Sequence, residues 1–410
     1  AGFYYKTFMG PHWHWFEPMI RRLAGLGRAP STPSADLVYE SRFDHCDVLV
    51  VGAGAAGLMA ALAAARAGAR VVLADDGLEA GGRLLADGAT IDGRPGLDWV
   101  KAVIAELDAT ANVRRLQDAT VWGYHEGNFL TIVERRPDKA GIHQRNRKLW
   151  AKEVVLATGA IERPIVFPNN DRPGVMLASA ARALVNEFAV RPGRRAVVFT
   201  NNDSAYETVF DLCRAGVDVA ALIDTRDRVS SPAADTVRGR SIELLSGHVV
   251  RDVRGRGGVS GVVVGPQGGT ARRTIACDLL CVSGGWNPTV HLYSQSRGKL
   301  RFAPELATFL PDVRSQRTHV AGAVNGRFDL GSCLEEGARA GAAAARAAGF
   351  PARPVDIPRT DSSAPPYAIE PCWSVDGGAR SNKDAFVDML GDVTLADIRL
   401  AVREGYRSIE

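Results

Sequence analysis

The chain has 410 residues, of which 46% are hydrophobic and 23% charged, so it is long enough for two or three folded domains, and wholesale disorder is excluded. Its formal net charge of +4 is small, and no basic cluster interleaved with aromatic residues indicates a nucleic-acid partner. The longest apolar run is broken by glycines, no signal peptide is visible, and the six cysteines form no C-x-x-C pair, which predicts a cytoplasmic protein without a membrane span, disulfide framework or metal cluster.

Residues 1–45 are rich in aromatic residues and then in proline and serine, and this composition predicts an N-terminal arm. Residues 16–26 are predicted to form a short amphipathic helix, and the remainder an extended segment. A dense set of aromatic side chains on such an arm favours a contact with another protein chain. His12 and His14 have no third ligand nearby, so a metal site is not expected there.

The stretch 46–76 has the order strand, glycine turn, helix, strand and acid that is typical of a dinucleotide-binding unit. Gly52, Gly54 and Gly57 supply the G-x-G-x-x-G pattern. The first glycine permits a tight turn, the second a close approach of the backbone to a pyrophosphate, and the third close packing of helix on strand. Asp75 follows 23 positions after Gly52, where its carboxylate would accept hydrogen bonds from an adenosine ribose. Such an acid repels a 2′-phosphate, so the pattern favours NAD or FAD over NADP.

Later segments are expected to complete this first nucleotide site. A loop containing Gly82 would pass near the dinucleotide, and the alternating pattern over 113–155 predicts a β-meander. The small residues around Gly159 in ATGAIERP follow the last strand of the meander, where the chain would turn close to the cofactor. Residues 318–349 predict a strand, a turn at Gly322 and a long Ala-rich helix, whose N-terminus would favour the phosphates of the cofactor.

Residues 195–224 repeat the strand–helix–strand pattern of the first unit. When the two units are aligned, Asn201, Asp203 and Tyr206 fall on the three glycines, and Asp224 falls on the ribose-binding acid. Asp203 would place a negative charge against a pyrophosphate, and Tyr206 would hold helix and strand apart. We therefore expect the second nucleotide site to be empty.

These elements predict an α/β protein with two Rossmann-like nucleotide-binding domains of the two-dinucleotide-binding flavoprotein (disulfide-reductase-like) type, flanked by N- and C-terminal arms. The first domain is expected to comprise residues 46–165 and 275–350, and the second residues 166–274. Residues 351–410 are predicted to be a linker that leads to a capped amphipathic helix over 394–407. The chain begins without an initiator methionine and stops abruptly, so both ends look cut.

Five stretches together resemble one known family over essentially the whole chain: AGFYYKTFMGP, FEPMIRRLAGLGRA, CDVLVVGAGAAGLMAALAAARAGARVVLADD, ATGAIERPIVFPNNDRPGVM and FVDMLGDVTLADIRLAVREGYRSIE. They are similar to the alpha subunit of heterotetrameric sarcosine oxidase. The resemblance implies the middle portion of a larger alpha subunit, between a small ferredoxin-like domain and a folate-binding aminomethyltransferase domain. It also implies beta, gamma and delta subunits as partners. Such a complex demethylates sarcosine to glycine, hydrogen peroxide and formaldehyde or methylenetetrahydrofolate.

The resemblance further implies NAD in the first nucleotide domain, FMN between the alpha and beta subunits, and FAD in the beta subunit. It assigns NAD contacts to Ala56, Asp75, Asp76, Gly77, Arg83, Val121, Ala323, Phe328 and Leu330. Together with the glycines, the expected cofactor-binding residues are Gly52, Gly54, Ala56, Gly57, Asp75, Asp76, Gly77, Gly82, Arg83, Val121, Gly159, Gly322, Ala323, Phe328 and Leu330. No catalytic or metal-binding residue is expected, because the histidines are scattered singly and no acid–base pair stands out beside the glycine turn.

Two alternatives remain open at this point. The glycine turn and Asp75 serve either adenosine cofactor, so the chain also fits an FAD-binding subunit of an opine- or hydroxyproline-type amine dehydrogenase. A freestanding pyridine-nucleotide-disulfide-type reductase would need a redox cysteine pair and a working second site, and the sequence has neither. Related amine-dehydrogenase subunits carry Cys-x-Cys before a similar V-T-x-x-D-I segment. Here those positions are Asp388 and Leu390, so iron–sulfur cluster binding is not expected.

Overall fold

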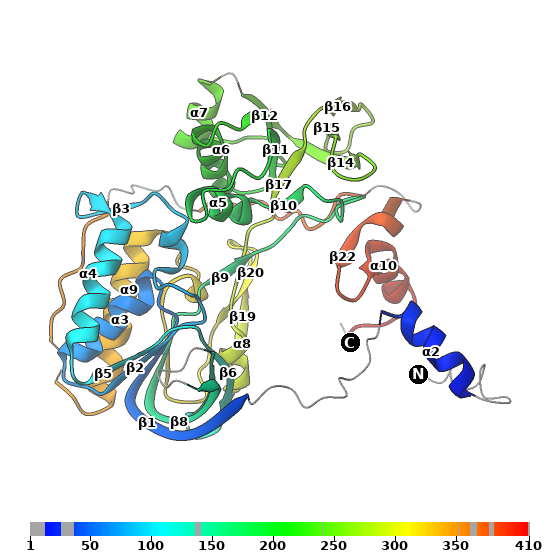
Figure 1. Ribbon diagram of the computed structural model, residues 1–410. Helices are drawn as coiled ribbons and strands as arrows, with labels where there is room; N and C mark the ends of the chain where they lie inside the picture. Colours follow the sequence, from blue (N-terminus) through cyan, green and yellow to red (C-terminus); the bar gives the residue numbers. More distant parts are fainter. Residues whose placement is uncertain are drawn as a thin grey trace.

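The computed structural model describes residues 13–25, 37–135, 141–240, 242–351, 353–360, 367–376 and 381–408. Two α/β units lie next to each other, and a smaller C-terminal part lies to one side of them (Figure 1). Among the described residues, no helix is both long enough and apolar enough to cross a membrane.

The first unit is built on a sheet with the strand order β5-β2-β1-β8-β7-β6, and β21 pairs with β8. β1, β2 and β5 run parallel, whereas β6, β7 and β8 form an antiparallel meander, as the sequence predicts. The apolar runs of β1 and β2 are buried on both faces of the sheet, as in other parallel sheets covered by helices. The strands are β1 (Val38–Val51), β2 (Val71–Ala74), β5 (Val113–Leu116), β6 (Ala119–His125), β7 (Phe129–Glu134), β8 (Ile142–Leu156) and β21 (Thr318–Val320).

β1 is longer than expected, because it begins at Val38 and pairs in parallel with β8 along its whole length. Residues 38–45 therefore belong to the first unit, and the expected domain boundary at residue 46 is wrong. The added part of the strand is rich in charged residues, which hides its pattern. In the structure these charges are paired across the sheet, since the guanidinium of Arg147 donates to the Asp44 carboxylate at 2.5 Å.

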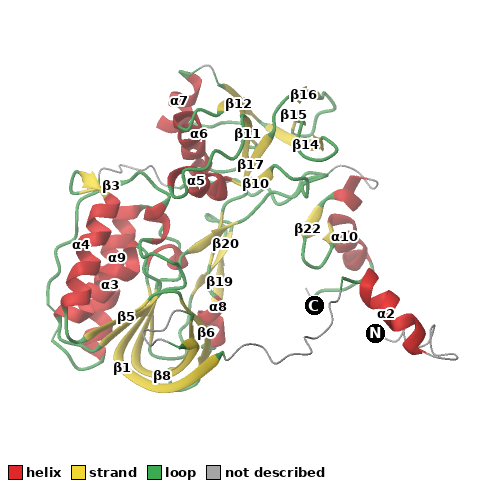
Figure 2. Ribbon diagram, viewed as in Figure 1, coloured by secondary structure: helices red, strands yellow, loops and turns green. Residues whose placement is uncertain are grey.

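Three helices cover one face of the first sheet: α3 (Ala55–Arg66), α4 (Gly96–Ala109) and α9 (Leu330–Ala347) (Figure 2). α3 lies between the other two and is almost completely buried. An added Cβ at Gly337 or Gly341 of α9 would collide with the backbone of Ala56 or Ala60. These two glycines thus allow the backbones of α9 and α3 to pack in direct contact. This packing holds α3, the helix that begins at the nucleotide turn, in position.

The second unit is a parallel sheet with the strand order β10-β17-β11-β12-β13. An antiparallel sheet of three strands, β14 to β16, is inserted in the chain between β13 and β17. The strands are β10 (Val175–Leu177), β11 (Arg195–Thr200), β12 (Asp218–Asp224), β13 (Glu243–Ser246), β14 (His248–Arg254), β15 (Gly261–Pro266), β16 (Arg273–Ile275) and β17 (Leu279–Ser283), and the helices are α5 (Ala178–Asn186), α6 (Tyr206–Arg214) and α7 (Pro232–Arg238).

β17 corrects the expected boundary at residue 274. This apolar strand lies between β10 and β11 and pairs with both, so residues 279–283 belong to the second unit. Its run of apolar residues predicts a buried strand but does not indicate to which sheet the strand belongs. The chain returns to the first unit only at β18 (Trp286–Pro288), which pairs antiparallel with β9 (Ala160–Glu162) of the outgoing connection.

The C-terminal part contains α10 (Leu395–Arg403), which begins at the predicted cap. The Thr394 side chain accepts from the N–H of Asp397, and the Asp397 carboxylate accepts from the N–H of Thr394. The helix predicted at 16–26 is observed as α2 (Trp13–Leu23), and residue 26 lies outside the described residues. The remaining short elements are η1 (Gly82–Leu85), β3 (Thr90–Ile91), β4 (Arg94–Pro95), η2 (Asp203–Ala205), α8 (His291–Gln295), β19 (Leu300–Ala303), β20 (Thr308–Pro311), η3 (Gly322–Asn325), η4 (Ser381–Asp384), β22 (Phe386–Asp388) and β23 (Val393–Thr394).

Candidate functional site

A cavity of about 870 Å³ opens at the carboxyl ends of β1 and β2. Its wall is formed by the glycine turn before α3, the residues after β2, the start of η1, the ATG turn after β8 and the segment from η3 to α9. This is the edge of a doubly wound sheet where nucleotides bind. The far end of the cavity reaches Ser179, Ala183 and Glu187, so the second unit contributes to it through α5 and the residue that follows it.

The glycine turn has the close backbone packing that the pattern predicts. Gly52 has a φ of +100°, and an added Cβ there would collide with the carbonyl oxygen of Ala157. At Gly57 an added Cβ would collide with the carbonyl oxygen of Gly52. At Gly54, by contrast, the nearest atom to an added Cβ is the Cα of Gly82 at 4.0 Å. The second glycine thus lies in the wall of an open cradle, as a pyrophosphate-binding turn requires.

Asp75 is held rigidly at the end of β2. Its Oδ2 accepts from the N–H of Ala53 at 2.6 Å, and its Oδ1 accepts from the N–H of Gly77 at 2.9 Å. The amide of Gln117 donates to the same Oδ1 at 3.1 Å and to the carbonyl oxygen of Gly77 at 2.8 Å. A carboxylate has about four acceptor positions, and three of those of Asp75 are occupied, so about one remains for a hydroxyl of a ribose. The structure therefore orients the carboxylate before any ligand binds.

The structure places most of the predicted residues around this one cavity. All of the expected cofactor-binding residues except Gly57 and Gly322 line it: Gly52, Gly54, Ala56, Asp75, Asp76, Gly77, Gly82, Arg83, Val121, Gly159, Ala323, Phe328 and Leu330. Gly57 and Gly322 lie behind the wall. The N–H of Gly322 donates to the Glu336 carboxylate at 2.8 Å, and an added Cβ there would meet the Cβ of Ala56. These two glycines shape the site without facing it.

The N-terminus of α9 carries its own acidic cap. The Asp329 carboxylate accepts from the N–H of Ser332 at 2.7 Å, which satisfies one of the free N–H groups that a phosphate would otherwise attract. On this side Arg327 also lines the cavity, and its guanidinium lies 3.7 Å from the Glu336 carboxylate. The cavity wall at this helix therefore presents backbone N–H groups and the guanidinium of Arg327, which sequence reasoning missed.

Arg83 and Trp286 lie against each other in the wall of the cavity. The guanidinium of Arg83 lies 4.6 Å from the centre of the Trp286 ring and forms an ion pair of 2.8 Å with Asp87. Trp286 comes from β18, far along the chain, and its indole N–H donates to Ser204 of the second unit at 2.9 Å. Sequence reasoning found Arg83 but missed Trp286 and Gln117, because only the folded sheets bring them to the site.

Cys333 is the cysteine in the cavity wall, and its environment is unsuited to redox chemistry. Burial raises the pKa of the Cys333 thiol to about 12, and its Sγ donates to the carbonyl oxygen of Arg327 at 3.1 Å. A thiol of this kind stays protonated at neutral pH and is a poor nucleophile. The six cysteines of the chain all lie in the described part and are all free.

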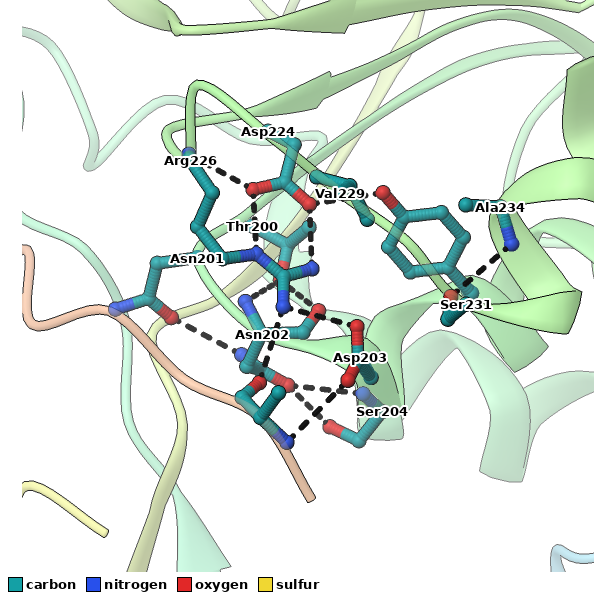
Figure 3. Close-up of polar contacts among 12 residues, drawn as sticks. Thr200, Asn201, Asn202, Asp203, Ser204, Asp224, Arg226, Val229, Ser231 and Ala234 are labelled. Carbon is teal, nitrogen blue, oxygen red and sulfur yellow. Dashed lines mark hydrogen bonds and ion pairs between the residues drawn. The ribbon is translucent and has the colours of Figure 1, made fainter. Parts of the chain in front are cut away.

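The second unit has a different construction at the equivalent turn (Figure 3). The hydroxyl of Tyr206 donates to the Asp224 carboxylate at 2.8 Å, and the guanidinium of Arg226 donates to both oxygens of Asp224 at 3.0 and 2.7 Å. Asp224 is completely buried. The acid that aligns with Asp75 of the first unit is therefore fully engaged by its own neighbours.

Residues 46–313 match the pyridine nucleotide-disulphide oxidoreductase family, and this match covers more than half of the chain. The chain belongs to that family. Solved structures support the fold of this pyridine nucleotide-disulphide oxidoreductase. A TM-score of 0.68 relates it to L-proline dehydrogenase from P. horikoshii, at 23% identity over 90% of this chain and 68% of that one. A TM-score of 0.60 relates it to thioredoxin reductase from T. acidophilum, at 18% identity over 74% of this chain and 98% of that one. The predicted fold class is confirmed.

The sequence relatives are more specific. The alpha subunit of sarcosine oxidase from Rhizobium meliloti (strain 1021) is 42% identical over 419 residues, covering 100% of this chain and 41% of the relative. The protein of the same name from Corynebacterium sp. (strain P-1) is 44% identical, and the match covers 95% of this chain and 42% of that relative. An opine oxidase subunit from Agrobacterium tumefaciens (strain Ach5) is 32% identical over 216 residues, covering 51% and 42%. The resemblance to sarcosine oxidase alpha subunits is therefore confirmed, and the chain spans about two fifths of the length of these relatives.

Proposed function

We propose that this chain is the nucleotide-binding portion of a sarcosine oxidase alpha subunit, with NAD held in the first site as a structural cofactor. The observation that carries the proposal is the geometry of the first cavity. Its glycine turn is open at Gly54, its ribose-binding acid Asp75 is already oriented, and the one cysteine in its described wall, Cys333, is kept protonated by burial. These features bind and orient a dinucleotide but supply no group to exchange electrons with it.

The assembled enzyme would demethylate sarcosine to glycine, hydrogen peroxide and formaldehyde or methylenetetrahydrofolate. Support comes from the identity of 42–44% to proteins named as alpha subunits of sarcosine oxidase. In this proposal FAD belongs to the beta subunit, FMN lies between alpha and beta, and gamma and delta complete the complex. This chain contributes the NAD site and surfaces for its partners.

A direct test is the identity of the nucleotide released from the purified chain by denaturation. Chromatography should find NAD in stoichiometric amount, and the visible absorption band of flavin should be absent. In an oxygen electrode, the chain alone should not consume oxygen with sarcosine, whereas the complex with the beta subunit should. Sarcosine-dependent oxygen consumption by the chain alone would overturn the structural role.

The second candidate is FAD in the same site, in a subunit of an opine- or hydroxyproline-type amine dehydrogenase. The similarity to the opine oxidase subunit over 216 residues favours it, and Asp75 would serve the adenosine of FAD equally well. The same denaturation experiment decides between the two, since released FAD and a flavin spectrum would replace NAD. A freestanding disulfide reductase is disfavoured, because Cys333 is the one cysteine among the described residues that line the cavity and its thiol pKa is raised.

A further inference from the structure

The segment 367–376, called the strap below, crosses the carboxyl end of the second sheet. Ile369 forms an antiparallel bridge with Asn202, and Ser374 forms a parallel bridge with Val166. The N–H of Glu370 donates to the carbonyl oxygen of Asn201 at 3.1 Å, and the N–H of Val375 donates to that of Val166 at 2.7 Å. Backbone hydrogen bonds thus hold the strap against the second unit at both of its ends.

The position of the strap is the one where a Rossmann unit binds a pyrophosphate. That position is the turn between the first strand and the following helix, here residues 201–205 between β11 and α6. The N–H of Asp203, which aligns with the second glycine of the first unit, donates to the carbonyl oxygen of Ala368 at 3.2 Å. A strap carbonyl therefore accepts the hydrogen bond that a phosphate oxygen would accept in a nucleotide-binding turn.

The charges at this turn are also satisfied from within the chain. The guanidinium of Arg226 forms an ion pair of 2.9 Å with Asp203, in addition to its two bonds to Asp224, and donates to the Ala368 carbonyl oxygen at 3.2 Å. In turn, the Asp203 carboxylate accepts from the N–H of Ala368 at 3.3 Å. Arg226 is 4% exposed, so this arginine is closed off from a phosphate in solution. One buried guanidinium links both carboxylates to the strap (Figure 3 shows the arginine and both acids).

The strap also contacts the first unit. The ring of Tyr367 lies 4.9 Å from that of Phe328, which lines the first cavity, and the guanidinium of Arg163 lies 4.5 Å from the Trp373 ring. Arg163 donates in addition to the carbonyl oxygen of Gly284 at 2.7 Å, in the connection between the units. The strap therefore binds to both units at the place where the chain crosses between them.

Going beyond the proposed function, we propose that the strap fills the second nucleotide site in cis. The segment 367–370 takes the place of a pyrophosphate, and the guanidinium of Arg226 holds this segment in position. The site therefore accepts no dinucleotide from solution. The second unit then serves as a fixed support for the first, because the strap fastens the two together.

The test is hydrogen–deuterium exchange on the whole chain, read by mass spectrometry at residues 200–208 and 367–376. In the unaltered protein, millimolar NADH or NADPH should leave exchange in both segments unchanged. Arg226→Ala and Asp203→Ala should each raise exchange in the strap several-fold. Arg226→Lys, which keeps the charge but lacks the planar fork that donates to both oxygens of Asp224, should give an intermediate increase. The matched control is Arg254→Ala, an exposed arginine of the same unit, which should change nothing in the strap.

Two results would overturn the proposal. The first is protection of residues 200–208 or displacement of the strap by NADH or NADPH in the unaltered chain. The second is unchanged strap exchange in both alanine variants. Circular dichroism and a melting curve show whether each variant folds, and if Arg226→Ala does not, the nucleotide experiment on the unaltered chain decides by itself. The nucleotide experiment is made on chain whose first site is already saturated, because Phe328 and Trp286 connect that site to the strap and to Ser204.

Discussion

The carboxylate of Asp75 accepts a 2.6 Å hydrogen bond from the N–H of Ala53, the residue between the first two glycines of the nucleotide turn. This bond joins the end of β2 to the end of β1 and fixes Asp75 relative to the glycine turn. The acid that we propose as the ribose ligand is therefore also a structural residue of the turn.

Asp75→Ala should weaken retention of the nucleotide about ten- to hundred-fold, because a hydrogen bond to a charged group contributes roughly 1.5–3 kcal/mol. The nucleotide content of the purified chain and calorimetric titration of the stripped chain measure the effect. Asp218→Ala is the control, since Asp218 is exposed and lies in the second unit. If the Asp75 variant keeps the nucleotide content of the unaltered protein, Asp75 is not the ribose ligand.

Gly57→Ala should destabilise the first unit by about 3 kcal/mol or more, because the new methyl group collides with the carbonyl oxygen of Gly52 and neither backbone can move away. The free energy of unfolding in urea measures this. Gly88→Ala is a matched control, since an added Cβ at Gly88 has no atom within 4 Å. Equal stabilities of the two variants would contradict the close packing of α3 on the turn.

Asp47 should make the first unit sensitive to acid. Hydrogen bonds from the side chain of Arg70 hold the pKa of this carboxyl well below its usual range, and Lys152 lies 2.9 Å from it. Because the pKa of Asp47 is lower in the folded than in the unfolded state, its ionised carboxylate stabilises the fold. This stabilisation is complete at pH values above the unfolded pKa of about 3.9, and it is lost as the pH falls from there towards the folded pKa.

Asp47→Asn should accordingly cost about 1–3 kcal/mol at pH near 7, since it removes hydrogen bonds to a charged group. The difference from the unaltered protein should shrink as the pH falls below about 4. Urea unfolding at several pH values tests this. A difference that stays constant down to acid pH would show that the charge of Asp47 is not what stabilises the fold.

Cys333→Ala should leave nucleotide content unchanged, because the thiol serves packing and not electron transfer. In the folded protein, alkylation of Cys333 at neutral pH should be much slower than in urea, since its pKa is raised to about 12 by burial. Mass spectrometry of the labelled peptide follows the reaction. Rapid labelling of the folded chain, or loss of the nucleotide on substitution, would reopen the disulfide-reductase alternative.

The sequence predicts the first nucleotide unit well, because strand, glycines, helix and acid lie within one short stretch and their chemistry is local. Asp75 and Gly57 are found this way. Gln117 and Trp286 are not, since their positions depend on sheet pairings between segments far apart in the chain. The same holds for the charged beginning of β1 and for β17, whose partners determine where they belong. Local pattern predicts the elements, while long-range pairing decides their neighbours.

The packing of α3 against α9 has a consequence for synthesis. α3 begins at Ala55, but its glycine-lined partner ends only at Ala347, after the whole second unit. At a ribosomal rate of about 5–20 residues per second, that delay is roughly 15–60 s. Throughout it the nascent chain carries an alanine- and leucine-rich helix with no partner for one of its faces. The first unit, whose translation begins first, is therefore the last to have all of its elements synthesised. Chaperones that bind exposed apolar helices should accordingly bind this protein during translation.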